Sequence, residues 1–98
     1  MQIIDFGAIG TAIDTTVIDD DGVVDVSAAD EIWLILKRPN GTRIKKQAIA
    51  VTVDGVSKAR YVTVANDMNK TGTWEHRVQI VTPLGSWTSI DPQKFEVV

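Results

Sequence analysis

The stretch MNKTGTWEHRVQIVT, residues 68–82, decides the fold of this 98-residue chain. From Trp74 onward, apolar and polar side chains alternate with a period of two, which is typical of a β-strand with one buried face. The buried face would carry Trp74, His76, Val78 and Ile80, and the other face Glu75, Arg77 and Gln79. The preceding segment, residues 69–72, is rich in turn-forming residues. We therefore expect a central strand that sets Trp74 into the core of a two-sheet sandwich.

Upstream, residues 9–19 alternate and are rich in β-branched side chains, so they predict a first long strand. The Asp-Gly pair at 21–22 predicts a hairpin, with residues 23–26 returning as a short strand. Residues 31–37 predict a further strand, in which Leu34 and Leu36 lie on the inward face. Trp33 and Ile35 occupy its other face, so this strand is either covered on both sides or presents these two residues to a partner.

Downstream, Pro39 and the Asn-Gly pair at 40–41 end that strand in a second hairpin. Residues 43–53 then predict one long edge strand whose lysines discourage unwanted pairing. Further strands are expected over 59–64, 73–82 and from 87 onward, with an interruption at Asp91-Pro92 before Phe95 returns to the core. No helical periodicity occurs, and the pattern predicts an all-β, immunoglobulin-like β-sandwich of about seven antiparallel strands. The expected core residues are Trp74, Val78, Ile80, Leu34, Leu36 and Phe95.

Length and composition limit the classes of protein. Ninety-eight residues predict a single domain over 1–98, and an apolar content of 44% is ordinary for a globular chain. The sequence contains no cysteine, which excludes disulfides, thiolate catalysis and cysteine-ligated metals. The N-terminal residues do not resemble a secretory signal, and no stretch approaches transmembrane length. We expect a protein made in the cytoplasm, with no membrane partner.

Charge is unevenly distributed along the chain, whose net charge is −3. Residues 1–36 hold eight acidic and no basic side chains, whereas residues 37–60 hold seven basic side chains against Asp54 alone. If this polarity survives in space, the acidic side of one copy could meet the basic side of the next. The alternative is that neighbouring strands mix the two signs and cancel them.

Several segments taken together resemble a known family. They are the strand over 9–19, the acidic turn DDG, VVDVS, Lys37-Arg38-Pro39-Asn40-Gly41-Thr42, RYVT, Thr71-Gly72-Thr73-Trp74 and the final FEVV. In this order they resemble the phage baseplate upper-protein N-terminal family, a group of immunoglobulin-like virion domains, over roughly residues 9–98. The resemblance implies a structural part of a bacteriophage tail or baseplate, located in the virion and made in the host bacterial cytoplasm. Its implied partners are other virion proteins and copies of itself, in an oligomer.

Residues that could carry chemistry have simpler interpretations. His76, the only histidine, is expected to be packed in the core or an interface, and no Gly-x-Ser-x-Gly motif surrounds any serine. The cluster Asp19-Asp20-Asp21 with Asp25 invites calcium, but adjacent carboxylates cannot all point inward, so a solvated turn is preferred. Asn40 and Asn69 match glycosylation sequences and are interpreted as turn residues. Arg43, Lys45 and Lys46 lack interleaved aromatics, so nucleic-acid binding is not expected. We expect no cofactor, no metal and no enzymatic activity.

The remaining candidates are interface residues. Tryptophan anchors interfaces because it buries a large area at low entropic cost. We expect an interface built from Trp33, Ile35, Arg43, Lys45 and Trp87, although a core position is an equal alternative for each tryptophan. Capsid decoration or a carbohydrate-binding module, in which exposed aromatics form a shallow platform, are the alternative functions. A hydrolase is the least supported class, because no nucleophile–base pair is evident.

Overall fold

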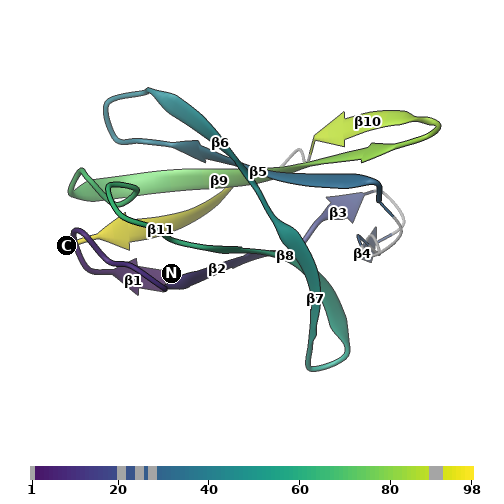
Figure 1. Cartoon of the computed structure of the whole chain (residues 1–98), viewed down its shortest axis with the longest axis horizontal. Helices are drawn as coiled ribbons and strands as arrows, with labels where there is room; N and C mark the ends of the chain where they lie inside the picture. Colours follow the sequence, from purple (N-terminus) through teal and green to yellow (C-terminus); the bar gives the residue numbers. More distant parts are fainter. Residues whose placement is uncertain (1, 20–21, 24–25, 27–28, 89–91) are drawn as a thin grey trace.

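Two β-sheets pack face to face in the computed structural model, which describes residues 2–19, 22–23, 26, 29–88 and 92–98 (Figure 1). The strands of this part of the chain are β1 (Gln2–Ile4), β2 (Ala12–Thr15), β3 (Ile18–Asp19), β4 (Gly22–Val23), β5 (Glu31–Lys37), β6 (Arg43–Gln47), β7 (Ile49–Val53), β8 (Val56–Val62), β9 (Gly72–Thr82), β10 (Gly85–Thr88) and β11 (Gln93–Val97). The all-β prediction is confirmed.

Strand β9 organises the larger sheet. Its order is β1-β11-β9-β5-β6, with β10 paired to the far half of β9. The smaller sheet has the order β2-β8-β7, and β3 and β4 form a separate hairpin. The pairing of β2, β8 and β7 in one sheet and of β5, β9 and β11 in the other matches the B-E-D and C-F-G sets of an immunoglobulin-like sandwich. The strands predicted over 31–37 and 73–82 are therefore central neighbours, as the register Leu34↔Val78 illustrates.

The core lies between the two sheets and is centred on aromatic side chains of the larger one. All six expected core residues, Leu34, Leu36, Trp74, Val78, Ile80 and Phe95, are buried. The rings of Trp74 and Phe95 stack with their centroids 5.6 Å apart, and the Trp74 indole Nε1–H donates a hydrogen bond to the Lys70 carbonyl oxygen at 2.9 Å. Ile13 and Ala59 meet this layer from the smaller sheet. The corner before β9 thus fixes the tryptophan that fills the core.

The corner itself requires Gly72. Its φ of +123° is a conformation that side-chain-bearing residues rarely adopt, and a Cβ here would stand 2.9 Å from the Pro39 side chain. Two of the segments in the family resemblance, residues 37–42 and 71–74, are therefore in direct contact.

The prediction of one long first strand over 9–19 is wrong. The chain forms β2 and β3 there, and the prediction missed β1, which pairs in parallel with β11. Gly10, with a φ of +80°, turns the chain just before β2. The predicted hairpin after residue 19 is present as the Asp19↔Gly22 pair, whereas residues 20–21 and 24–25 lie outside the described part.

The prediction of one long edge strand over 43–53 is also wrong. The chain changes sheets at Ala48, so β6 lies at the edge of the larger sheet and β7 at the edge of the smaller one. Ala48 is buried, and its amide donates a hydrogen bond to the Ile32 carbonyl oxygen at 2.8 Å. A small residue allows this close passage between the layers. The described residues form more strands than the seven expected, and they are not all antiparallel, because β1 pairs in parallel. The interruption near Asp91-Pro92 falls between β10 and β11, and residues 89–91 lie outside the described part.

Candidate interaction surfaces

Four of the five predicted interface residues lie together on the outer face of the larger sheet. Alternation along β5 sends Trp33 and Ile35 away from the core, and both are partly exposed. The register places Lys45 beside Ile35, and Arg43 beside Lys37, on the neighbouring strand β6. The other neighbour, β9, adds Arg77 beside Ile35. This group is a half-buried apolar patch with cations beside it, and Glu31 and Glu75 lie on the same face.

Trp33 is partly covered by its neighbours within the chain. The Lys45 ammonium lies 4.9 Å from the centre of the indole ring, a cation–π contact, and the indole Nε1–H reaches the Glu31 carboxylate at 3.5 Å. Strand β5 is central in its sheet, because β9 and β6 flank it, but no second layer of described residues covers its outer face. The interface role of Trp33 remains a prediction.

Trp87 lies elsewhere, on a hairpin that leaves the body of the sandwich. Its register partner is Ile80, so its side chain points to the opposite face of the sheet from Trp33. The indole is 53% exposed, and Leu84 at the tip of the β9–β10 hairpin is 91% exposed. Figure 1 shows this hairpin extending beyond the smaller sheet, which explains why Trp87 is not in the core. The structure therefore separates Trp87 from the other four candidates.

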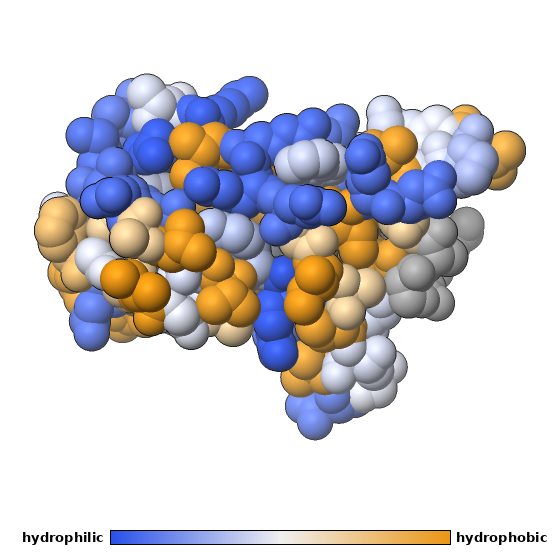
Figure 2. Space-filling model, viewed as in Figure 1, coloured by the Kyte–Doolittle hydropathy of each residue, from blue (hydrophilic) through white to orange (hydrophobic). Residues whose placement is uncertain are grey.

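The β7–β8 hairpin is a second projection (Figure 1). The Asp-Gly pair at 54–55 predicted a turn here, but sequence reasoning did not indicate that the hairpin leaves the body of the sandwich. Asp54 and Gly55, with φ values of 51° and 78°, form its two-residue turn. Positive φ at both positions is characteristic of a type I′ turn. On β7, Ile49 is 60% exposed, and apolar side chains gather over this hairpin in Figure 2. The signal that could have found it is the absence of any charged residue between Lys46 and Asp54.

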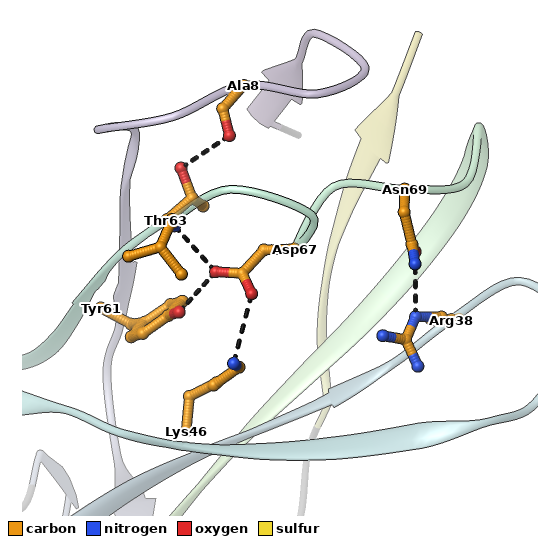
Figure 3. A network of polar contacts seen from close by, with 8 residues as sticks. Ala8, Arg38, Lys46, Tyr61, Thr63, Asp67 and Asn69 are labelled. Carbon is orange, nitrogen blue, oxygen red and sulfur yellow. Dashed lines mark hydrogen bonds and ion pairs between the residues drawn. The ribbon is translucent and has the colours of Figure 1, made fainter.

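A buried polar network fixes the loop between β8 and β9 (Figure 3). The Tyr61 hydroxyl and the Val64 amide both donate to the Asp67 carboxylate, and the Lys46 ammonium lies 3.3 Å from its other oxygen. Burial raises the pKa of Asp67, but the bonds from Tyr61, Val64 and Lys46 outweigh it and hold that pKa below its usual value. Burial together with Asp67 raises the pKa of Tyr61. Charge on Asp67 is therefore part of the folded state.

This loop forms one wall of an open hollow at the end of the sandwich. The hollow is lined by Phe6, Pro39, Asn40, Asn69, Lys70 and Thr71. Phe6 is 59% exposed, and the Arg38 guanidinium joins two walls by donating from Nε to the Asn69 amide oxygen at 3.2 Å (Figure 3). Both asparagines singled out in the sequence thus face one surface depression.

His76 is a buried structural residue. It is 4% exposed, its Nδ1 is hydrogen-bonded to the Thr15 hydroxyl of the opposite sheet, and its ring lies 5.6 Å from that of Phe95. Burial lowers the pKa of His76 to about 4, so the ring is neutral at pH 7. His76 therefore links the two sheets, and it is packed in the core as the sequence predicted.

Charges of opposite sign meet within the chain. Asp14 of the acidic segment accepts two hydrogen bonds from Arg60 of the basic segment, at 2.7 and 2.9 Å. The hydrogen bond from Arg60 lowers the pKa of Asp14. Among the described residues no group of three or more metal-ligating side chains occurs. The aspartates at 20, 21 and 25 lie outside the described part.

Comparisons with protein-family models, with curated proteins and with solved structures found no match to this chain. In the part of the chain that the structure describes, no helix is long and apolar enough to cross a membrane.

Proposed function

We propose that this chain is a structural component of a bacteriophage virion, in the tail or baseplate, acting through protein–protein contacts in multiple copies. The observation that carries the proposal is the pair of projecting hairpins, whose tips and edges expose Ile49, Leu84 and Trp87 to solvent. Exposed apolar groups rimmed by polar residues are typical of protein interfaces. The resemblance of residues 37–42 and 71–74 to a baseplate family is the reason for proposing a tail or baseplate as the assembly.

The outer face of β5 and β6 gives further support. Trp33 and Ile35 form an apolar centre. Four cations lie around it, and they outnumber the two carboxylates of this face: the cations are Lys37, Arg43, Lys45 and Arg77, and the carboxylates are Glu31 and Glu75. Tryptophan and arginine are the residues on which interface energy most often concentrates. A partner with acidic side chains and an apolar centre fits this face.

Mass spectrometry of purified phage particles tests the proposal. The chain should be found in mature virions at a stoichiometry of many copies, and its absence from them would refute a virion role. Trp33→Ala should leave a folded protein that is incorporated poorly. Trp33→Phe, which keeps an aromatic ring over Lys45, is the matched control.

A carbohydrate-binding module is the second candidate, and one observation favours it. The open hollow combines an exposed aromatic ring, Phe6, with the amide side chains of Asn40 and Asn69. Carbohydrate recognition commonly pairs an aromatic face with hydrogen-bonding amides, which are donors and acceptors at once. Phe6 and Trp87 lie on different parts of the chain, however, and only Phe6 lines this hollow. Saturable binding of the isolated protein to a glycan array, lost in Phe6→Ala, would favour this candidate over the structural one.

A further inference from the structure

The four strands that end the two sheets differ in how they are protected. An exposed strand edge presents unpaired backbone groups that can pair with another chain, and proteins usually block such edges with charges, short strands or covering groups. In the larger sheet, β6 carries Arg43, Lys45 and Lys46, and β1 has three residues. In the smaller sheet, glutamines cover the two ends of the β2 edge: Gln2 donates to the Ala12 carbonyl oxygen at 3.0 Å, and Gln93 donates to that of Thr16, just after the strand, at 3.3 Å.

Strand β7 has none of these protections. Its sequence, Ile-Ala-Val-Thr-Val over Ile49–Val53, contains no charge and no proline, and three of its five residues are apolar and β-branched. Among the described residues its only pairing partner is β8. Ile49, Ala50 and Thr52 are exposed, so solvent reaches both faces of the strand. Its open edge is less protected than the edges of β6, β1 and β2.

The turn determines which backbone groups lie at that edge. Asp54 and Gly55 form a two-residue turn that closes on the pair Val53↔Val56. A turn of this type closes on a hydrogen-bonded pair, and hydrogen-bonded and free residues then alternate along the strand. Val53, Val51 and Ile49 therefore point their amides and carbonyls toward β8. Ala50 and Thr52 point theirs to the open edge.

We propose that β7 is a self-association site, at which a second copy of this chain adds its own β7 in antiparallel orientation across a two-fold axis through Val51. In this register Ala50 of one copy lies opposite Thr52 of the second copy. All four residues that offer free amides and carbonyls then pair, giving four backbone hydrogen bonds. On the outer face, Ile49 lies opposite Val53 of the second copy and Val51 opposite its own equivalent. The five-residue sequence is nearly palindromic in side-chain type, as an isologous contact requires.

The pairing also closes the assembly. The merged sheet would have the order β2-β8-β7 from one copy followed by β7-β8-β2 from the second, so both of its ends are the glutamine-covered β2 strands. Association through this edge therefore stops at two copies. This contact would be one of those that join copies in the proposed virion role, but it can be tested in solution without any particle. Either proposal can therefore fail without the other.

Engineered cysteines test the register, because the natural chain has none. Across the axis, Val51 and its equivalent form a pair without mutual hydrogen bonds, with Cα atoms about 4.5 Å apart. This spacing suits a disulfide. Val51→Cys should form a disulfide-linked dimer under mild oxidation. Ile49→Cys is the matched control on the same strand and face, and its equivalent would lie four residues away along the strand, about 13 Å.

The dimer itself is tested by sedimentation over a range of protein concentrations. The wild type should pass from monomer to dimer and no further. Val51→Lys should weaken dimerisation at least tenfold because two like charges meet at the axis, whereas Val62→Lys, the same exchange on the 46%-exposed β8 position, should not. Unchanged circular dichroism shows that each variant is folded. Equal cross-linking of the two cysteine variants, a wild type that stays monomeric throughout, or association beyond two copies would overturn the proposal.

Discussion

At the centre of the sandwich Trp74 and Phe95 are fully buried, whereas on the β7–β8 hairpin Ile49 keeps 60% of its surface exposed. Both regions are strand pairs rich in apolar residues, and they differ in what lies opposite them. The β9 face meets the smaller sheet, while the hairpin extends past the larger one (Figure 1). The same residue types therefore stabilise the fold in one region and remain available for a partner in the other.

The largest effect should come from the buried region. Trp74→Ala removes the ring that stacks on Phe95 and leaves a cavity between the sheets, so the free energy of unfolding should fall by about 3–5 kcal/mol. Urea unfolding followed by circular dichroism measures it. Trp87→Ala, on the exposed hairpin, is the matched control and should change stability by less than about 1 kcal/mol. Similar losses in both variants would remove the distinction between the two regions.

Acid should weaken the centre through His76. Its pKa is about 4 in the folded chain and 6.5 when unpacked, so the unfolded state binds the proton first as the pH falls. The stabilisation from the neutral ring is complete above pH 6.5 and is lost progressively down to about pH 4, by about 3 kcal/mol in all.

Stability should therefore be measured at several pH values for the wild type and for His76→Gln, which cannot titrate. The difference between the two proteins should shrink as the pH falls from 6.5 to 4. A difference that is constant with pH would show that the His76 ring does not titrate in this way.

The polar corner should contribute less than the aromatic centre. Asp67→Ala leaves the Tyr61 hydroxyl and the Val64 amide without their acceptor, which should cost about 2 kcal/mol. Tyr61→Phe removes one of these donors and keeps the carboxylate paired with Lys46, so a loss of about 1 kcal/mol is expected. Thermal unfolding of both variants shows which one loses more stability, and a larger loss for Tyr61→Phe would contradict this prediction.

The smallest effect on stability should come from the hairpin edge. Val51→Lys places a charge on a partly exposed residue opposite Lys58 of the same chain, and the free energy of unfolding of the monomer should fall by about 0.5 kcal/mol. Unfolding at dilute protein concentration isolates the monomer. A loss comparable to that of Trp74→Ala would place β7 in the fold-determining region.

Local sequence patterns predicted the strands that have the same environment along their whole length. Strands β5 and β9 were found almost to the residue, because their alternation reflects one buried face along the whole length. The break at Ala48 could not be predicted in this way, since no glycine or proline marks the point at which the chain passes from one sheet to the other. Trp33, Ile35, Arg43 and Lys45 share one surface because their two strands are joined by a short hairpin, which the sequence predicts. The position of Trp87 depends on the register of β10 with β9, which no local pattern gives. The hollow around Phe6 unites three loops far apart in sequence, so no local pattern indicates it.

Amide hydrogen exchange, followed residue by residue at low and high protein concentration, compares the two regions directly. Amides of β9 should be strongly protected at both concentrations, because their protection depends on the fold alone. The amides of Ala50 and Thr52 should exchange rapidly in dilute solution and become protected as the concentration rises. Protection of these two amides already in the monomer, or rapid exchange at every concentration, would contradict the assignment of β7 as an edge open to a second copy.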